Sequence, residues 1–290
     1  MTNQERIGSP KEFKYFPGNA GLWLWLSIVA VLLAIAGNTI ALAVPSIYAR
    51  LTPVFFPQAI AQDIASLVFV SPTWLILVVL ALRGSVRAYL LWLGVLTFTI
   101  YNYVIYTFSV PFGSLFLLWV AVFGLSLYAL IGGVASINHE SVKSSFQSKR
   151  VVTFVAWFLI VVAILFALLW LSEDVPALLS GNTPQSVIDM AIPTNPVHIL
   201  DLGFFLPAVI VTAVMLLRMR PLAYTVAPAF IFFLILTGIP ILFTPIVQSA
   251  RGETAAWGVV VPIGTLIVLL LGLLAWLLST IHSDSTKESK

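Results

Sequence analysis

The sequence predicts an all-α polytopic membrane helix bundle with about eight transmembrane helices, and three observations support this prediction. Hydrophobic residues fill 60% of the 290 positions and charged residues only 9%, whereas soluble domains carry roughly a quarter charged residues. Apolar runs follow one another at about the 20-residue length that a bilayer core requires. Basic residues gather in alternate interruptions between these runs, as the positive-inside rule describes.

The individual spans are defined by apolar runs and by the Pro, Gly and charged residues that punctuate them. The expected spans are 21–44, 64–82, 86–109, 112–136, 151–171, 196–217, 222–247 and 256–280. Together they predict one bundle domain over 21–281, with polar tails at 1–20 and 282–290. The first tail is mixed in charge, unlike the start of a cleavable signal peptide, so the first helix is expected to be retained.

Basic residues predict the orientation of the bundle. With a cytoplasmic N-terminus and eight spans, both termini are cytoplasmic, and the outer loops hold only Arg50 and Arg251. Twelve basic residues then fall on the inner side, which is the asymmetry expected of a correct topology. These residues are Arg6, Lys11, Lys14, Arg83, Arg87, Lys143, Lys149, Arg150, Arg218, Arg220, Lys287 and Lys290.

Two outer connections are long enough to have structure of their own. Residues 45–63 mix aromatic residues with three prolines and suit a segment in the outer interface. Residues 172–195 have room for one short amphipathic helix. Either connection caps a pocket or serves as an ordinary connector. No internal repeat is evident from hydropathy, although the polar connection 137–150 divides the spans four and four.

The sixth span places ionisable groups inside the membrane. Asn195 is expected to cap the helix, and Pro196 fits its first position, where the missing N–H does no harm. His198 and Asp201 are three residues apart and therefore share one helical face. An ionisable pair inside a span is costly without a partner or a function. The pair is therefore a candidate ligand site, with interhelical hydrogen bonding as the alternative.

Further polar side chains fall in the same outer half of the bilayer when the alternating directions of the spans are followed. Asn102 and Tyr106 share a face of the third span, with Tyr103 to one side, while Asn38 lies in the first span and Asp63 at the start of the second. An amide needs partners in hydrocarbon. Tyrosines also form interfacial aromatic belts, which is the alternative for this helix. The candidate ligand-binding set is Asn38, Asp63, Asn102, Tyr103, Tyr106, His198 and Asp201.

The composition excludes several chemistries. There is no cysteine, so thiol catalysis, iron–sulfur clusters and Cys-ligated zinc are excluded. His139, His198 and His282 are the only histidines, too few for a multi-histidine zinc or bis-histidine haem site. No span contains a lysine for a retinal Schiff base. Dispersed basic residues argue against nucleic acid as a partner. No cofactor and no metal is expected.

Two stretches carry a resemblance to a known group of proteins. They are YNYVIYTFSVPFGSLFLLWVAVFGLSLYALI and TNPVHILDLGFFLPAVIVTAVMLLRMRPLAYTVAPAF, about a quarter of the chain. The sequence resembles a family of uncharacterised prokaryotic polytopic membrane proteins with a Tyr-x-Tyr-x-x-Tyr helix and a Pro-Val-His-x-Leu-Asp helix. The resemblance implies a prokaryotic plasma membrane and no assigned activity. It points to Tyr103, Tyr106, His198 and Asp201.

Three function classes fit these features. In the first, an outer-half polar pocket binds a small or lipidic ligand for transport, with His198 and Asp201 handling a proton or a cationic group. In the second, the protein is a sensor or an accessory subunit that acts through a membrane protein partner. In the third, His198 and Asp201 serve as acid and base on a lipid, although no activated nucleophile stands beside them. The lipid bilayer is a partner in every case.

Overall fold

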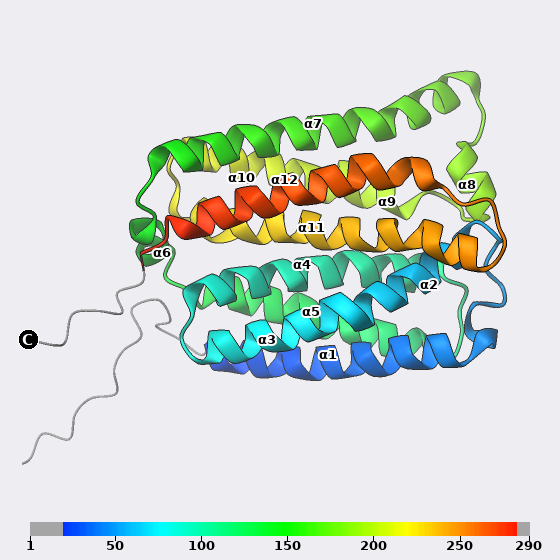
Figure 1. Cartoon of the computed structure of the whole chain (residues 1–290), viewed down its shortest axis with the longest axis horizontal. Helices are drawn as coiled ribbons and strands as arrows, with labels where there is room; N and C mark the ends of the chain where they lie inside the picture. The colour runs from blue at the N-terminus through cyan, green and yellow to red at the C-terminus, as the bar shows by residue number, and fades with distance from the viewer. Residues whose placement is uncertain (1–19, 283–290) are drawn as a thin grey trace, which may run out of the picture.

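The computed structural model describes residues 20–282 and contains eight helices long and apolar enough to cross a membrane (Figure 1). The predicted all-α polytopic bundle is therefore confirmed, and this is a multi-pass membrane protein. Residues 20–282 form no β-strand, and a single bridge pairs Phe146 with Ile281. The polar tails expected at 1–20 and 282–290 fall, except for their innermost residues, on 1–19 and 283–290, which lie outside the described residues.

The helices run in the following order. The first four spans are α1 (Ala20–Ala43), α2 and α3 (Phe55–Ala65 and Ser71–Leu82), α4 (Val86–Ser109) and α5 (Phe116–Ala135). The last four are α7 (Lys149–Ser180), α9 and α10 (Pro196–Leu200 and Leu206–Leu217), α11 (Pro221–Ala250) and α12 (Val260–Ser279). Short helices α6 (His139–Ser145) and α8 (Gln185–Met190) lie in connections. Single 3-10 turns form at η1 (Pro45–Tyr48) and η4 (Trp257–Val259).

Two spans contain a π-helical turn where an α-helix would be continuous. In the second span η2 (Ser66–Val70) joins α2 to α3, and in the sixth span η3 (Asp201–Phe205) joins α9 to α10. A π-turn accommodates one extra residue in a helix and is frequently found at functional sites. Each π-turn is followed within two residues by a proline, Pro72 or Pro207, which has no N–H to donate to the helix.

Predicted and observed spans agree most closely for 86–109 and 196–217, which are bounded by charge and by Pro. Two other spans are longer than predicted. The second begins at Phe55, so much of the expected interfacial segment 45–63 is helix and Asp63 lies within the span. The fifth continues to Ser180, past Pro176, and ends at Gly181 in the left-handed conformation.

The centre of the bundle is α4. It is the least apolar of the eight spans, with a mean hydropathy of 1.5, and 78% of its span is buried, against 22% for α12. Polar side chains are tolerated in a membrane when protein rather than lipid surrounds them. The polar composition of α4 therefore agrees with its central position, and the mostly exposed, apolar surface of α12 suits a position at the rim of the bundle.

Both ends of the described chain lie at one face of the bundle (Figure 1). We call this the basic face, because the turns and connections that hold Arg83, Lys143, Lys149 and Arg218 lie there. The opposite end, which carries α8 and the end of α7, is called the acidic face. Successive spans therefore run alternately from the basic face to the acidic face and back.

The two halves of the chain form an internal repeat that hydropathy alone does not reveal. Four consecutive element boundaries recur 135 residues later in the second half. The equivalent pairs are the ends of α2 and α9 (Ala65 and Leu200), and the starts of η2 and η3 (Ser66 and Asp201), of α3 and α10 (Ser71 and Leu206), and of α4 and α11 (Val86 and Pro221). The expectation of no internal repeat is therefore corrected.

Residues and hydrogen bonds recur at the same spacing. The identical pairs include Pro72 and Pro207, Arg83 and Arg218, and Tyr89 and Tyr224. The turn between α3 and α4 closes with a 3.0 Å bond from the Ser85 N–H to the Leu80 carbonyl. The turn between α10 and α11 closes with the equivalent 2.9 Å bond from Arg220 to Met215. The shared boundaries and turn geometry indicate that the second and third spans repeat as the sixth and seventh.

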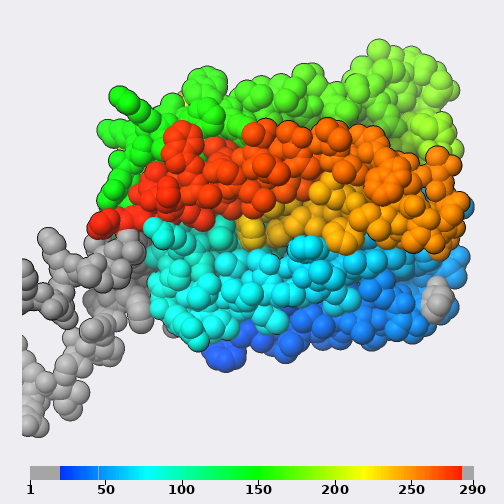
Figure 2. Space-filling view, in the orientation of Figure 1, coloured from blue at the N-terminus to red at the C-terminus, as the bar shows by residue number. Residues whose placement is uncertain are grey.

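The seam between the repeats runs along α4 and α11, which lie side by side in the middle of the bundle, with the first half on one side and the second on the other (Figures 1 and 2). Gly94 and Ala229 are equivalent positions and meet there, since a Cβ built on Gly94 would lie 2.6 Å from the Ala229 carbonyl oxygen. The matched spans are four apart in the order of the eight spans, so they cross the bundle in the same direction. The repeats are therefore parallel rather than inverted.

The two equivalent turns predict opposite effects of substitution. Gly84 has φ 87° and Met219 has φ 53°, both in the left-handed region that disfavours side chains. Gly84→Ala should lower the free energy of unfolding by about 1 kcal/mol, whereas Met219→Gly should raise it by up to about 1 kcal/mol. Thermal unfolding of the detergent-solubilised protein measures both. Shifts of the same sign would contradict the equivalence of the two turns.

Candidate functional site

Asp63 is the centre of a closed hydrogen-bond network in the first half, and its side chain has no exposed surface. The Tyr48 hydroxyl donates to Asp63 Oδ2 and the Tyr106 hydroxyl donates to Asp63 Oδ1, both at 2.8 Å. The network therefore joins η1, α2 and α4. Burial and the neighbouring carboxyl raise the pKa of Tyr48, so its hydroxyl keeps its proton and acts as a donor.

Other predicted residues extend this Asp63 network. The Tyr103 ring stacks on Tyr106 with centroids 5.7 Å apart, and its hydroxyl donates to Asn38 Oδ1 over 3.4 Å. Asn102 is also buried, on the same helix. Tyr103 and Tyr106 are therefore interior groups, and the aromatic-belt interpretation is wrong for them. The network connects α1, η1, α2 and α4 near the acidic face.

A second group of ionisable side chains surrounds His198 in the other half. His198 Nδ1 lies 2.9 Å from Asp174 Oδ1, and Nε2 lies 3.8 Å from Glu173 Oε2. The Trp170 ring stacks on the imidazole with centroids 4.6 Å apart. Trp170, Glu173 and Asp174 all project from the last turns of α7, so the length of this helix brings its carboxyls to His198.

Asp201 is held on the same side by aromatic residues. The Trp170 Nε1–H donates to Asp201 Oδ2 at 2.8 Å, and Tyr101 of α4 lies close enough to interact with the same carboxyl. Asp201 is the first residue of the π-turn η3. Trp170 therefore contacts both His198 and Asp201 and joins them into one group. We call Glu173, Asp174, His198 and Asp201 the acidic cluster.

The connection on the acidic face fixes the start of the sixth span. Asn195 caps the helix as predicted, because its Oδ1 accepts the N–H groups of Val197 at 3.0 Å and His198 at 3.4 Å. Its Nδ2 donates to Ser186 Oγ at 3.1 Å, and the Ser186 N–H donates to Glu173 Oε1 at 2.9 Å. Helix α8, the short helix expected within 172–195, is therefore tied to both walls of the acidic cluster.

Six of the seven predicted residues thus fall into two groups rather than one, and the seventh, Asn102, is buried on α4. Asn38, Asp63, Tyr103 and Tyr106 form the first, and His198 and Asp201 belong to the second. The two groups use different sides of α4, since Tyr101 approaches Asp201 whereas Tyr103 and Tyr106 approach Asn38 and Asp63. Residues two apart on a helix point about 200° apart, which explains the division.

Sequence reasoning missed four partners of these groups: Tyr48, Trp170, Glu173 and Asp174. Glu173 and Asp174 were missed because the fifth span was expected to end at 171, whereas Trp170 lies inside that span and its contacts depend on how the helix is rotated. The signal that marks its true end is Gly181, which adopts φ 68° at the helix C-terminus. Tyr48 lies in an irregular connection, and no periodic pattern relates it to Asp63.

The charge balance of the acidic cluster favours a cation. Three carboxyl groups surround one imidazole, and no Lys or Arg within residues 20–282 forms an ion pair with any of them. Glu173 and Asp174 are a third exposed, at 33% and 32%, whereas His198 is 5% exposed. Within residues 20–282 no three His, Asp or Glu side chains are arranged to hold a metal ion.

The Asn195 cap gives a prediction of moderate size. Asn195→Ala removes the acceptor for two backbone N–H groups and the bond to Ser186. It should lower the free energy of unfolding by about 1 kcal/mol, as for other N-caps. Asn195→Asp keeps the acceptor and should cost less. Thermal unfolding of the two variants tests this, and equal losses would argue against the capping role.

Comparisons of the chain with models of protein families, with characterised proteins and with solved structures find no match. The function proposed below therefore rests on the geometry and charge of the acidic cluster.

Proposed function

We propose that this protein is a transporter of the prokaryotic plasma membrane that binds a small cationic ligand at the acidic cluster. The basic face is the cytoplasmic side, as the positive-inside rule predicts, and the acidic cluster lies toward the outside. The observation that supports this function best is an uncompensated group of three carboxyls around His198, two of them partly exposed.

The exposure of the cluster increases toward the acidic face. Glu173 and Asp174 reach the surface, His198 is buried beneath them, and Asp201 lies one turn further along the span. A cation that enters between the two α7 carboxyls would meet the Trp170 ring and then Asp201. Aromatic faces and carboxylates both stabilise a desolvated cation. His198 can accept or release a proton as the cation arrives.

The architecture around the cluster also suits transport. Parallel repeats related by an axis along the membrane normal are found in several transporter folds, and their ligand sites lie near interruptions in the helices. Asp201 begins the π-turn η3, and its equivalent position, Ser66, begins η2. In this proposal the Asp63 network anchors the first half, while the second half carries the ligand.

Charge movement in proteoliposomes tests the proposal. Wild-type protein, assayed on a solid-supported membrane with choline, tetramethylammonium and spermidine as probes, should give a transient current with at least one of them. Asp174→Asn and Asp201→Asn should each weaken the apparent affinity about tenfold, the loss expected for one charged contact. Asp189→Asn is the matched control, because this exposed carboxyl of α8 bonds only Gln185 within residues 20–282.

Three results would overturn the proposal. Currents that are equal in wild type and in the cluster variants would remove the role of the acidic cluster. A stoichiometric membrane partner without any charge movement would favour the sensor or accessory role. A changed lipid composition that depends on His198 and Asp201 would favour the lipid-modifying alternative.

A further inference from the structure

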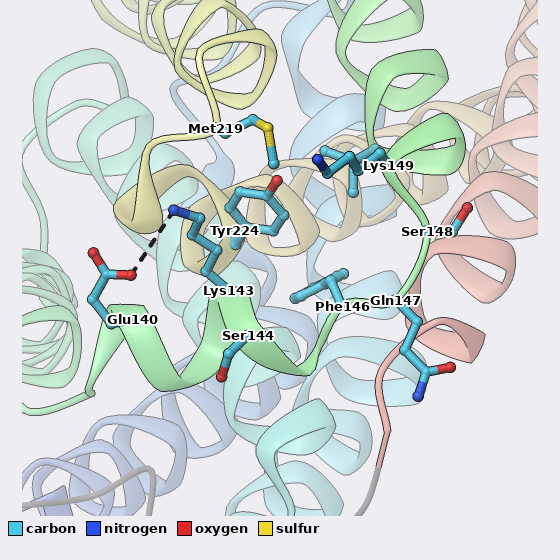
Figure 3. A pocket seen from close by; sticks show the side chains of 10 residues that line it. Glu140, Lys143, Ser144, Phe146, Gln147, Ser148, Lys149, Met219 and Tyr224 are labelled. Carbon is cyan, nitrogen blue, oxygen red and sulfur yellow. Dashed lines mark ion pairs between the residues drawn. The ribbon is translucent and has the colours of Figure 1, made fainter.

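A separate pocket lies at the basic face, at the opposite end of the bundle from the acidic cluster. It has a volume of about 200 Å³ and is bounded by α6, the start of α7 and the turn between α10 and α11 (Figure 3). Phe146 and Val152 supply apolar lining, while Lys143, Lys149 and Tyr224 supply polar groups. The pocket is therefore amphipathic, with cationic side chains at its rim.

Tyr224 is the most informative residue in this pocket. Only 4% of it is exposed, and its ring packs edge-on against Phe146 with centroids 5.3 Å apart. Within residues 20–282 its hydroxyl forms no hydrogen bond, although the residue lines the pocket. Its hydroxyl is not among the fully buried polar atoms that have no partner, so it opens onto the pocket and can donate a hydrogen bond to a ligand atom there.

The equivalent tyrosine of the first half shows the contrast. Tyr89 donates its hydroxyl to the Gly133 carbonyl at 2.8 Å and is fully buried. Tyr224 occupies the same position in the repeat but faces the pocket. The turns before these tyrosines also differ. The second half has Met219, which lines the pocket and has φ 53°, at the position that Gly84 occupies in the first half. Strained backbone of this kind clusters at functional sites.

The charges around Tyr224 suit an anion. Lys143 and Lys149 lie on either side of it in Figure 3, and among residues 20–282 the only acid that lines the pocket is Glu140. Glu140 lies 3.9 Å from Lys143 and is 74% exposed, so it offsets one lysine and leaves Lys149 without an ion pair within residues 20–282. Helices α7 and α11 both begin here, and the positive ends of their dipoles add to the field.

We infer that this pocket binds the phosphate group of an anionic phosphate ester, with Lys149 and Lys143 pairing with the phosphate and Tyr224 donating a hydrogen bond. Lysine and hydroxyl groups are common phosphate ligands. Basic pockets between helices at the cytoplasmic interface accept lipid headgroups. A soluble phosphate ester presents the same chemistry. This inference does not depend on the transport proposal, because it uses other residues at the opposite face.

Lipid nanodiscs distinguish the sources of the phosphate. Thermal unfolding is measured in phosphatidylcholine nanodiscs, with and without phosphatidylglycerol, and again with millimolar glycerol 3-phosphate. The melting temperature of wild type should rise by about 3 °C with one of these probes, a typical shift for a bound ligand. A rise with phosphatidylglycerol alone identifies a lipid headgroup, and a rise with glycerol 3-phosphate identifies a soluble ester.

Variants then locate the site. Lys149→Gln and Tyr224→Phe should each lose most of the rise, whereas Arg150→Gln should keep it. Arg150→Gln is the matched control, because it removes one positive charge from the residue next to Lys149, and Arg150 does not line the pocket. Native mass spectrometry of retained phosphatidylglycerol gives a second readout that does not depend on stability. The inference is overturned if neither probe raises the melting temperature, or if all three variants respond as wild type does.

Discussion

Replacing Asp63 by leucine should lower the free energy of unfolding by about 4 kcal/mol, the largest loss expected of any single side chain considered above. Leucine leaves the hydroxyls of Tyr48 and Tyr106 buried without the acceptor that each now bonds at 2.8 Å. The loss also weakens the connection between η1, α2 and α4, which these hydrogen bonds link. Thermal unfolding, or unfolding in a graded detergent series, measures the effect.

Asp63→Asn is the informative control. Its amide keeps one acceptor oxygen and a similar volume, so the loss should fall to about 1–2 kcal/mol. Asp189→Asn, on an exposed side chain of α8, should change stability by less than about 0.5 kcal/mol. If Asp63→Leu unfolded at the wild-type temperature, the network would not be the anchor of the first half.

Gly94→Ala is expected to have the second largest effect, a loss of about 3 kcal/mol. Its new Cβ would lie 2.6 Å from the Ala229 carbonyl oxygen and 3.0 Å from the Phe232 Cβ. Backbone cannot move aside as a flexible side chain does, so α4 and α11 would have to separate. These helices form the seam between the repeats, and the strain would therefore spread to both halves.

Gly124→Ala is the matched control for this prediction. Gly124 lies in α5, and a Cβ there would meet no atom within 4 Å. The substitution should leave stability unchanged or raise it slightly, because alanine favours helix more than glycine does. Equal melting temperatures for the Gly94 and Gly124 variants would show that α4 and α11 can move apart without cost.

Hydrophobicity and charge predicted the number of helices because both are local properties of the sequence. The third and sixth spans were placed most closely, since Arg83, Arg87 and Asn195–Pro196 mark their starts. The repeat does not show in hydropathy, because its signature is a few identical residues and a shared backbone geometry. Equivalent turns share backbone hydrogen bonds, whereas one turn uses glycine and the other methionine. The π-turns have no sequence signal beyond the following prolines.

The candidate site was predicted residue by residue but not as an arrangement. Polarity inside a span singled out His198 and Asp201, whereas Asp63 was expected at the start of the second span and lies within it, fully buried. Which of them meet depends on the rotation of each helix, which packing sets. Tyr101 and Tyr103 illustrate this, because they are two residues apart on α4, yet Tyr101 approaches Asp201 and Tyr103 bonds Asn38. The carboxyls of α7 were missed through an error of about nine residues in one boundary.

The repeat has a consequence for how the molecule moves. Asp63 and His198 occupy equivalent positions, one turn before the π-turn of their unit. Asp63 is locked by two hydroxyls from neighbouring segments, whereas His198 contacts side chains that reach the surface. The equivalent positions of the two halves are therefore held by different kinds of contact. If the protein is a transporter, as proposed above, we expect the first half to be the fixed frame and α7, α9 and α10 to move against it.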